Sequence, residues 1–389
     1  MTTAPHARTR AAHTGNDEFL LTPGPLTTSL TVKQAMLRDW GSRDKQFIAL
    51  NARIRDKLVG IAGGEGDYVT VPVQGSGTFA VEATLGTLLP RDGKLLVLVN
   101  GAYGERMMKI AKYMGRSAIA LSCAEDRTPD LASLETLLSE DKAITHVAAV
   151  HCETTSGILN PIAEIADIVA KHGRSLIIDA MSAFGAIPLD VREITCDAIA
   201  ASSNKCLEGV PGVGYAIIRR AALEKCEGNA HSLALDLYDQ CRALDGNGQW
   251  RFTPPTHVLA AFDQAVAEFE KEGGVPARNA RYSENCRTLV EGMRDLGFET
   301  LLPDDLQAPI IVTFHMPADP KFDFTAFYDF LAARGYVIYP GKLTVAPTFR
   351  IGCIGQLVKA DLEAALAVIA EVLGEMGVTQ CGPAANAAE

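Results

Sequence analysis

Short apolar runs alternate with amphipathic stretches along the chain from about residue 65 to residue 250. We predict strands for the apolar runs, which lie at 68–73, 94–100, 146–151, 175–179, 198–202 and 214–218. Intervening stretches such as 79–89 and 105–113 have the spacing of helices. Runs that are apolar throughout and alternate with helices are typical of a mostly parallel sheet with helices on both faces. The pattern therefore predicts an α/β domain.

The pattern changes after Pro254-Pro255, where apolar residues recur at steps of three and four between 259 and 269. We predict a helix there, a polar helix to 294, and then a strand at 309–315, a helix at 324–334, a strand at 348–352 and a helix at 359–373. These elements form a smaller α+β domain. The predicted divisions are a disordered tail at 1–17, the N-terminal segment and large domain at 18–257, the small domain at 258–375 and a mobile tail at 376–389.

The composition limits the partners of the protein. A length of 389 residues favours two domains, and a net charge of −11 argues against nucleic acid or an anionic membrane as a partner. No apolar run is long enough to span a bilayer. The nine cysteines are scattered singly without a Cys-x-x-Cys motif, which predicts reduced thiols in the cytoplasm and neither a disulfide framework nor a metal site.

A carboxylate and a lysine follow two of the predicted strands. Asp179 closes the run at 175–179, and Lys205 comes shortly after the run at 198–202. The carboxyl ends of parallel strands meet at one edge of a sheet, where such sheets bind ligands. Pyridoxal phosphate chemistry needs this pair, because the lysine forms a Schiff base and the carboxylate keeps the pyridine nitrogen protonated. Each residue alone also has an ordinary interpretation, Asp179 as a helix N-cap and Lys205 as a surface charge.

A glycine-rich segment, Gly75-Ser76-Gly77-Thr78-Phe79-Ala80, follows the first predicted strand and opens a helix. Free backbone N–H groups at a helix start bind phosphate well, and glycine lets the ligand approach closely. The segment also fits G-x-G-x-x-A, so a nicotinamide-dependent dehydrogenase is an alternative. That class expects an acidic residue at the end of the next strand, where this chain has Asn100. A third possibility is a tight strand–helix turn without a ligand.

The order of these features along the chain resembles the class V aminotransferases of the fold-type-I pyridoxal phosphate superfamily, over residues 18 to 375. The stretches that carry the resemblance are 21–25, 75–78, 100–106, 151–157, 179–182, 202–209, 251–255 and 339–342. The resemblance implies a large domain with a mostly parallel seven-stranded sheet, a smaller α+β C-terminal domain, and a homodimer whose active sites lie at the subunit interface. It also implies pyridoxal 5′-phosphate as the cofactor.

The same resemblance assigns roles residue by residue. Lys205 would hold the cofactor and move the substrate proton, and Asp179 would pair with the pyridinium nitrogen. Tyr103 would stack on the ring, and Thr154 or Thr155 would bond the ring hydroxyl. The phosphate would be surrounded by Ser76, Gly77, Thr78, Ser202 and Asn204, with Thr253 reaching it from the neighbouring subunit. Arg350 would bind the substrate carboxylate through two parallel hydrogen bonds, and Pro23, Gly24 and Pro25 would also contact the substrate.

Within the class, the chain is similar to the subfamily that transfers the amino group of 2-aminoethylphosphonate to pyruvate in phosphonate degradation. Arg251 and Lys342 are candidate phosphonate partners because of their charge and location. Alanine–glyoxylate and serine–glyoxylate aminotransferases share the same core motifs and are the first alternative. A class V cysteine desulfurase would need a cysteine on a mobile loop, and none stands in an obvious position. A binding protein without catalysis remains the alternative outside enzymes, and it predicts that Lys205 can be replaced freely.

Overall fold

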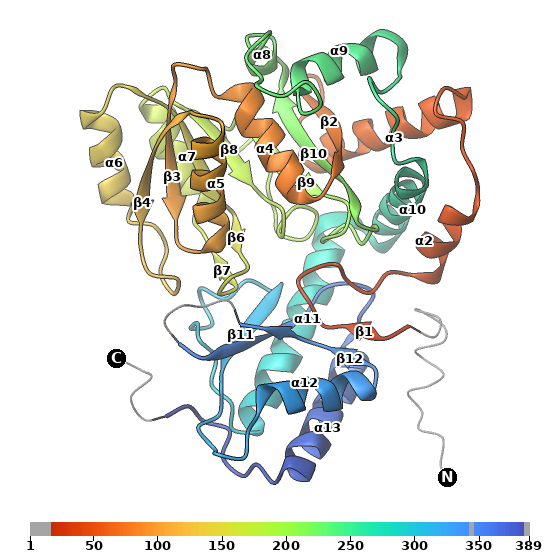
Figure 1. Ribbon diagram of the computed structural model, residues 1–389, viewed down its shortest axis with the longest axis vertical. Helices are drawn as coiled ribbons and strands as arrows, with labels where there is room; N and C mark the ends of the chain where they lie inside the picture. The colour runs from red at the N-terminus through yellow and green to blue at the C-terminus, as the bar shows by residue number, and fades with distance from the viewer. Residues whose placement is uncertain (1–16, 342–345, 385–389) are drawn as a thin grey trace.

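A seven-stranded sheet forms the centre of the larger part of the molecule (Figure 1). The computed structural model describes residues 17–341 and 346–384. The strands have the order β2-β10-β9-β8-β5-β3-β4. Their bounds are β2 Tyr68–Gly75, β3 Lys94–Val99, β4 Ser117–Ser122, β5 Ile144–Val150, β8 Ser175–Asp179, β9 Ala198–Ser202 and β10 Gly212–Arg219. All neighbouring strands are parallel except β10, which is antiparallel to both β2 and β9. The predicted mostly parallel α/β sheet is confirmed.

Helices cover both faces of this sheet. One face packs against α4 Gly77–Leu88, α5 Ala102–Tyr113 and α9 Leu237–Asn247. The opposite face packs against α3 Lys45–Ile61, α6 Leu131–Glu140, α7 Ile162–Lys171 and α10 Thr256–Glu272. Successive side chains of a strand point to opposite faces, so Ile177 of β8 joins the first apolar layer and Ile178 joins the second. This two-sided burial explains why the central strands read as continuous apolar runs.

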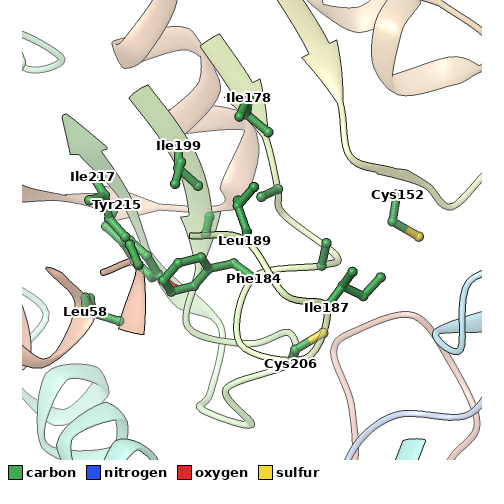
Figure 2. Packing of buried hydrophobic residues seen from close by; sticks show 14 of the residues in the cluster. Leu58, Cys152, Ile178, Phe184, Ile187, Leu189, Ile199, Cys206, Tyr215 and Ile217 are labelled. Atoms are coloured by element: carbon green, nitrogen blue, oxygen red, sulfur yellow. The ribbon is translucent and has the colours of Figure 1, made fainter. Parts of the chain in front are cut away.

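The second apolar layer is seen from close by in Figure 2, where Ile178, Ile199 and Ile217 project from three neighbouring strands. Tyr215 stacks on Phe262 of α10 with ring centroids 5.7 Å apart. Cys206 belongs to the same buried cluster, although it lies in the turn after β9. The turn that carries Lys205 is therefore anchored directly in the core.

The smaller part of the molecule is built on a three-stranded antiparallel sheet with the order β11-β14-β13. Its elements are α11 Gly274–Asp295, β11 Ile311–His315, α12 Phe324–Ala333, β13 Tyr339–Pro340, β14 Thr348–Gly352 and α13 Lys359–Met376. The N-terminal strand β1 Phe19–Leu20 pairs in parallel with β12 Tyr336–Val337, and its Phe19 belongs to the apolar cluster of this part. The N-terminal segment therefore packs first on the C-terminal part and then enters the large sheet. The domain boundaries given above stay a prediction.

The remaining elements are short: α2 Leu30–Gln34, a 3₁₀ turn η1 at Ala35–Leu37, β6 Cys152–Glu153, β7 Ile158–Leu159 and α8 Arg220–Leu223. No helix within residues 17–341 or 346–384 has the length and apolar character needed to cross a membrane. Two longer elements, β4 and α3, were not among the strands and helices expected from the pattern. Strand β4 is the edge of the sheet and buries none of its six side chains fully, so it lacks the apolar run that marks the inner strands.

Candidate active site

The carboxyl ends of β5, β8 and β9 meet at one edge of the large sheet. In the strand register, Asp179 lies between Val150 of β5 and Ala200 of β9. Ser202 ends β9 two residues further on, and Lys205 follows in the next turn. The structure thus brings Asp179, Ser202 and Lys205 to the same edge, as parallel strands require.

The Lys205 side chain points toward the turn at Pro23 and Gly24. Its Nζ donates a hydrogen bond of 2.5 Å to the carbonyl oxygen of Pro23. Gly24 has a φ of +106°, and a Cβ there would come within 2.8 Å of both Lys205 Cδ and the Asn204 carbonyl oxygen. Only glycine fits this position. Burial lowers the pKa of Lys205 to about 8, against an ordinary value of 10.5, and the negative charge of Asp179 partly opposes that shift.

Asp179 is buried, with only 5% of its surface exposed. Burial raises the pKa of its carboxyl group to about 6. The negative charge of Glu153 also raises this pKa, whereas a hydrogen bond of 3.0 Å from the Met181 N–H and the positive charges of Arg106 and Lys205 lower it. A cationic ligand group beside Asp179 would favour the ionised carboxylate.

The start of α4 has the features of a phosphate site. Ser76 occupies the N-cap position but makes no side-chain cap hydrogen bond, so the first helical N–H groups are not capped by it. A side chain at Gly77 would collide with Met181 Sδ. The Thr78 hydroxyl accepts a hydrogen bond of 3.1 Å from Arg106 Nη1. Ser76, Gly77 and Thr78 are therefore adjacent and lie beside the segment that follows Asp179.

A buried carboxylate holds the start of α5 and with it Tyr103. Glu153 is fully buried, and its carboxylate accepts hydrogen bonds from the Tyr103 N–H at 3.1 Å and the Thr155 N–H at 3.0 Å. Gly101, the N-cap residue of α5, packs directly on this carboxylate. Gly101 has no side chain that could cap α5, and Glu153 of β6 caps the helix instead. Burial raises the pKa of Glu153 above its usual range.

The two neighbouring threonines differ in what their hydroxyl groups contact. Thr155 Oγ1 donates to Glu153 at 2.5 Å and accepts from the Ala102 N–H at 3.0 Å. Thr154 Oγ1 is buried and has no partner among the described residues, and the same is true of Ser202 Oγ. Buried hydroxyl groups are rarely left unsatisfied, so these two fit a ligand that brings polar atoms to this edge. Of the two threonines, Thr154 has the available hydroxyl.

Arg350 lies on β14 of the small sheet and reaches across to the turn between β6 and β7. Its Nη1 donates to the carbonyl oxygen of Thr154 at 2.7 Å, and its Nε and Nη2 donate to that of Pro340 at 3.2 and 3.0 Å. The side chain is 2% exposed, and burial lowers its pKa. These carbonyl groups fix the plane of the guanidinium, which still has N–H groups to offer a carboxylate or phosphonate.

Four of these residues, Gly77, Thr78, Tyr103 and Asp179, line one small cavity together with Val81, Arg106, Met107 and Met181. Arg106 and Glu153 were both within motif stretches, yet neither received a role from the sequence. The signal for Glu153 was a charged residue two positions after the predicted strand at 146–151, between the uncharged residues Cys152 and Thr154.

Two predicted residues, Thr253 and Arg251, lie in a separate surface groove, and a third, Lys342, lies outside the described residues. Thr253 is exposed in a surface groove with Ser42 and Arg251. Arg251 donates to the carbonyl oxygen of Leu233 at 3.0 Å, so its guanidinium is engaged locally. A role for Thr253 in a neighbouring subunit stays a prediction.

The family model of the class V aminotransferases matches residues 29–365. The chain belongs to this family. It is 56% identical over 362 residues to the 2-aminoethylphosphonate–pyruvate transaminase of Pseudomonas fluorescens, covering 93% of this chain and 98% of that protein. It is also 56% identical over 369 residues to 2-aminoethylphosphonate–pyruvate transaminase 2 of Burkholderia lata, with 95% and 98% covered.

The fold of this class V aminotransferase is also found in a solved structure. An alanine–glyoxylate aminotransferase from Nostoc sp. superposes with a TM-score of 0.85 at 24% identity, covering 92% of this chain and 95% of that one. This likeness concerns the fold, so the predicted fold class is confirmed by both the sheet topology and a solved relative.

Proposed function

We propose that the protein transfers the amino group of 2-aminoethylphosphonate to pyruvate, giving phosphonoacetaldehyde and L-alanine in phosphonate degradation. The observation that carries the choice of substrates is the 56% identity, over nearly the full length of both chains, to transaminases named for this pair. The alanine–glyoxylate alternative has weaker support, because its solved relative is 24% identical and shares the fold alone.

We infer that pyridoxal phosphate is the cofactor, and the residues at the sheet edge fit it. Lys205 supplies the amine for attachment, and Asp179 supplies the carboxylate for the ring nitrogen. The unpartnered Thr154 hydroxyl suits the ring hydroxyl, and the unpartnered Ser202 hydroxyl suits the phosphate. The open start of α4 at Ser76, Gly77 and Thr78 suits the phosphate as well. When bound, this cofactor supplies an electron sink for negative charge at the substrate carbon.

Lys205 is suited to move the substrate proton. Because its pKa is about 8, a substantial fraction of its amine is neutral near neutral or mildly alkaline pH. Its Nζ can take a proton from the carbon that bears the amino group and later return one. The Pro23 carbonyl oxygen accepts a hydrogen bond of 2.5 Å from this amine and thereby orients it. Asp179 remains anionic beside a cationic ring nitrogen, since an opposite charge favours the ionised carboxylate.

Arg350 is suited to bind the anionic end of both substrates in turn. 2-Aminoethylphosphonate and pyruvate each carry an anion, and a guanidinium recognises phosphonate and carboxylate with similar geometry. The bonds to Thr154 and Pro340 fix the guanidinium before substrate arrives, which reduces the entropy lost on binding. Pro23 and Gly24 lie beside Lys205, whose Nζ donates to both of their carbonyl oxygens, and we expect the adjoining Pro25 to contact the substrate with them.

A homodimer with shared active sites and a cytoplasmic location belong to the same proposal. Phe79 and Phe252 are 49% and 50% exposed, and they stand next to Thr78 and Thr253. Both rings are compatible with a surface that a second subunit covers. A second copy of the chain would bury them and bring its Thr253 to the phosphate site. Nine cysteines without a disulfide suit a reducing compartment.

The deciding experiment follows the visible absorbance of the purified protein as substrates are added singly. We expect a bound chromophore, its loss on addition of 2-aminoethylphosphonate, and its return with pyruvate. Alanine and serine, followed by glyoxylate, are the comparison pairs. The K205A variant should lose the covalent chromophore and at least ~10³-fold in turnover, because both attachment and proton transfer depend on that amine.

Each alternative predicts a different result in this experiment. Bleaching by alanine or serine but not by 2-aminoethylphosphonate would favour the glyoxylate-using enzymes. Absence of any chromophore after incubation with pyridoxal phosphate would overturn the cofactor assignment. A K205A protein with normal turnover would remove Lys205 from the mechanism.

A further inference from the structure

Arg106 lies on α5, one helical turn after Tyr103, and touches two walls of the cavity at once. Residues three apart on a helix share a face, and the Arg106 guanidinium carbon lies 4.7 Å from the centroid of the Tyr103 ring. Its Nη1 donates at 3.1 Å to the Thr78 hydroxyl in the first turn of α4. Arg106 therefore connects the residue expected to stack on the cofactor ring with a residue of the expected phosphate site.

The charge of Arg106 points to an anionic ligand. The guanidinium lines the cavity, and no carboxylate of the described residues lies within ion-pair distance of it. Its positive charge still reaches Asp179, whose pKa it lowers. A guanidinium that has no carboxylate partner can form charge-assisted hydrogen bonds with an anionic ligand. A phosphate at the start of α4 would be such a ligand.

We propose that Arg106 is a positioning residue for the cofactor, holding the Tyr103 ring from one face and the Thr78 hydroxyl at the phosphate site. The inference rests on the proposed function, because it takes pyridoxal phosphate as the ligand. Cation–π contact with one face of Tyr103 leaves the opposite face for the pyridine ring. The fork of the guanidinium allows the stacking contact and the hydrogen bond to exist together, which an ammonium group does less well.

The test compares binding of pyridoxal phosphate to the apoprotein of three variants. R106M removes the stacking charge and the hydrogen bond at similar length, and R106K keeps the charge but not the planar fork. K109M is the matched control, since Lys109 lies on the same helix over the exposed Tyr113 ring at 5.9 Å, away from the cavity. We expect the dissociation constant of R106M to rise ~10-fold over that of K109M, from loss of one cation–π contact and one hydrogen bond.

Two further readouts separate positioning from general stability. The visible circular dichroism of the bound chromophore should change in R106M, because the ring contacts a displaced Tyr103. The rise in melting temperature that pyridoxal phosphate causes should be smaller in R106M than in K109M, whatever the stability of each apoprotein. Combining R106M with T78V should cost less than the sum of the two single changes. R106K should bind the cofactor more weakly than the wild type.

The outcomes are decisive in both directions. A dissociation constant for R106M within about twofold of that for K109M would overturn the inference. Full recovery by R106K would also overturn it, because charge alone would then suffice. Failure of the wild-type apoprotein to bind pyridoxal phosphate would instead overturn the proposed function. The two failures can be told apart, because one is seen in the wild type and the other only in the comparison of R106M with K109M.

Discussion

At the scale of single residues, the groups packed around Lys205 set the pKa of its amine. A solvated lysine is almost fully protonated near neutral pH, and a protonated amine is not a nucleophile. Burial lowers the pKa of Lys205 from 10.5 to about 8. The close approach of Gly24 and the Pro23 carbonyl completes this environment.

This pKa predicts how the apoprotein captures pyridoxal phosphate at different pH. At pH values below the pKa, each increase of one pH unit raises the neutral fraction of the amine about tenfold. The capture rate should therefore rise steeply up to pH 8 and then level off. An ordinary lysine would keep gaining rate up to about pH 10. Stopped-flow absorbance measures the rate, with a free lysine derivative as the control for titration of the cofactor itself. A rate still rising tenfold per unit above pH 9 would contradict the lowered pKa of Lys205.

At the scale of elements, α5 depends on a cap that comes from a distant strand. Gly101 precedes the helix and has no side chain to cap it, and the buried Glu153 carboxylate bonds the Tyr103 N–H instead. This cap decides where α5 begins and hence where Tyr103 and Arg106 stand. Helix α9 has an ordinary cap, in which Asp236 accepts from the Asp239 N–H three residues later.

We therefore expect E153A to lower the free energy of unfolding of the apoprotein by ~2–3 kcal/mol, since it leaves buried N–H groups without acceptors. D236A should have a smaller effect, because water can replace that partly exposed cap. E153Q keeps an acceptor and should fall between the wild type and E153A. Urea unfolding followed by circular dichroism gives all three values. If E153A cost no more than D236A, the capping role of Glu153 would be wrong.

At the scale of the whole molecule, a buried ionic cluster joins the Lys205 turn to the C-terminal part. Glu208 is 2% exposed and accepts hydrogen bonds from Arg281 at 2.7 Å, Tyr282 at 2.6 Å and Gln356 at 2.6 Å. Arg278, fully buried on α11, forms an ion pair with Glu208 at 3.4 Å and bonds the Cys206 carbonyl. The turn that carries Lys205 is thus tied to α11 and to the segment after β14, which carries Arg350.

Removing one partner of such a cluster leaves buried charges uncompensated. We expect E208A to lower the free energy of unfolding by ~3–5 kcal/mol, because two arginines then share Glu272 alone. D304A is the matched control, since it breaks the exposed pair between Arg294 and Asp304 and should cost much less. Chemical denaturation of the apoproteins measures both. Equal losses in E208A and D304A would show that the cluster does not hold the two parts together.

The strands that could be predicted from the sequence are those buried on both faces. The bounds of β8 and β9 agree with the apolar runs at 175–179 and 198–202. Strand β4 was not predicted, because an edge strand with exposed side chains has no continuous apolar run. Helix α3 was not predicted either, although its buried residues Phe47, Leu50, Ile54 and Leu58 have helical spacing. Polar residues surround them in the sequence, and their burial comes from contact with distant elements.

The sequence by itself determined the family and the order of the chemical groups along the chain. Asp179, Lys205 and the glycine segment could be recognised because strand ends and glycine turns are local features that residue type encodes. Only the tertiary structure decided which hydroxyl of Thr154 and Thr155 is free, that Glu153 caps α5, and that Arg106 connects Tyr103 with Thr78. These properties depend on distances between segments far apart in the chain, and a pKa or a hydrogen bond depends on those neighbours rather than on the residue alone.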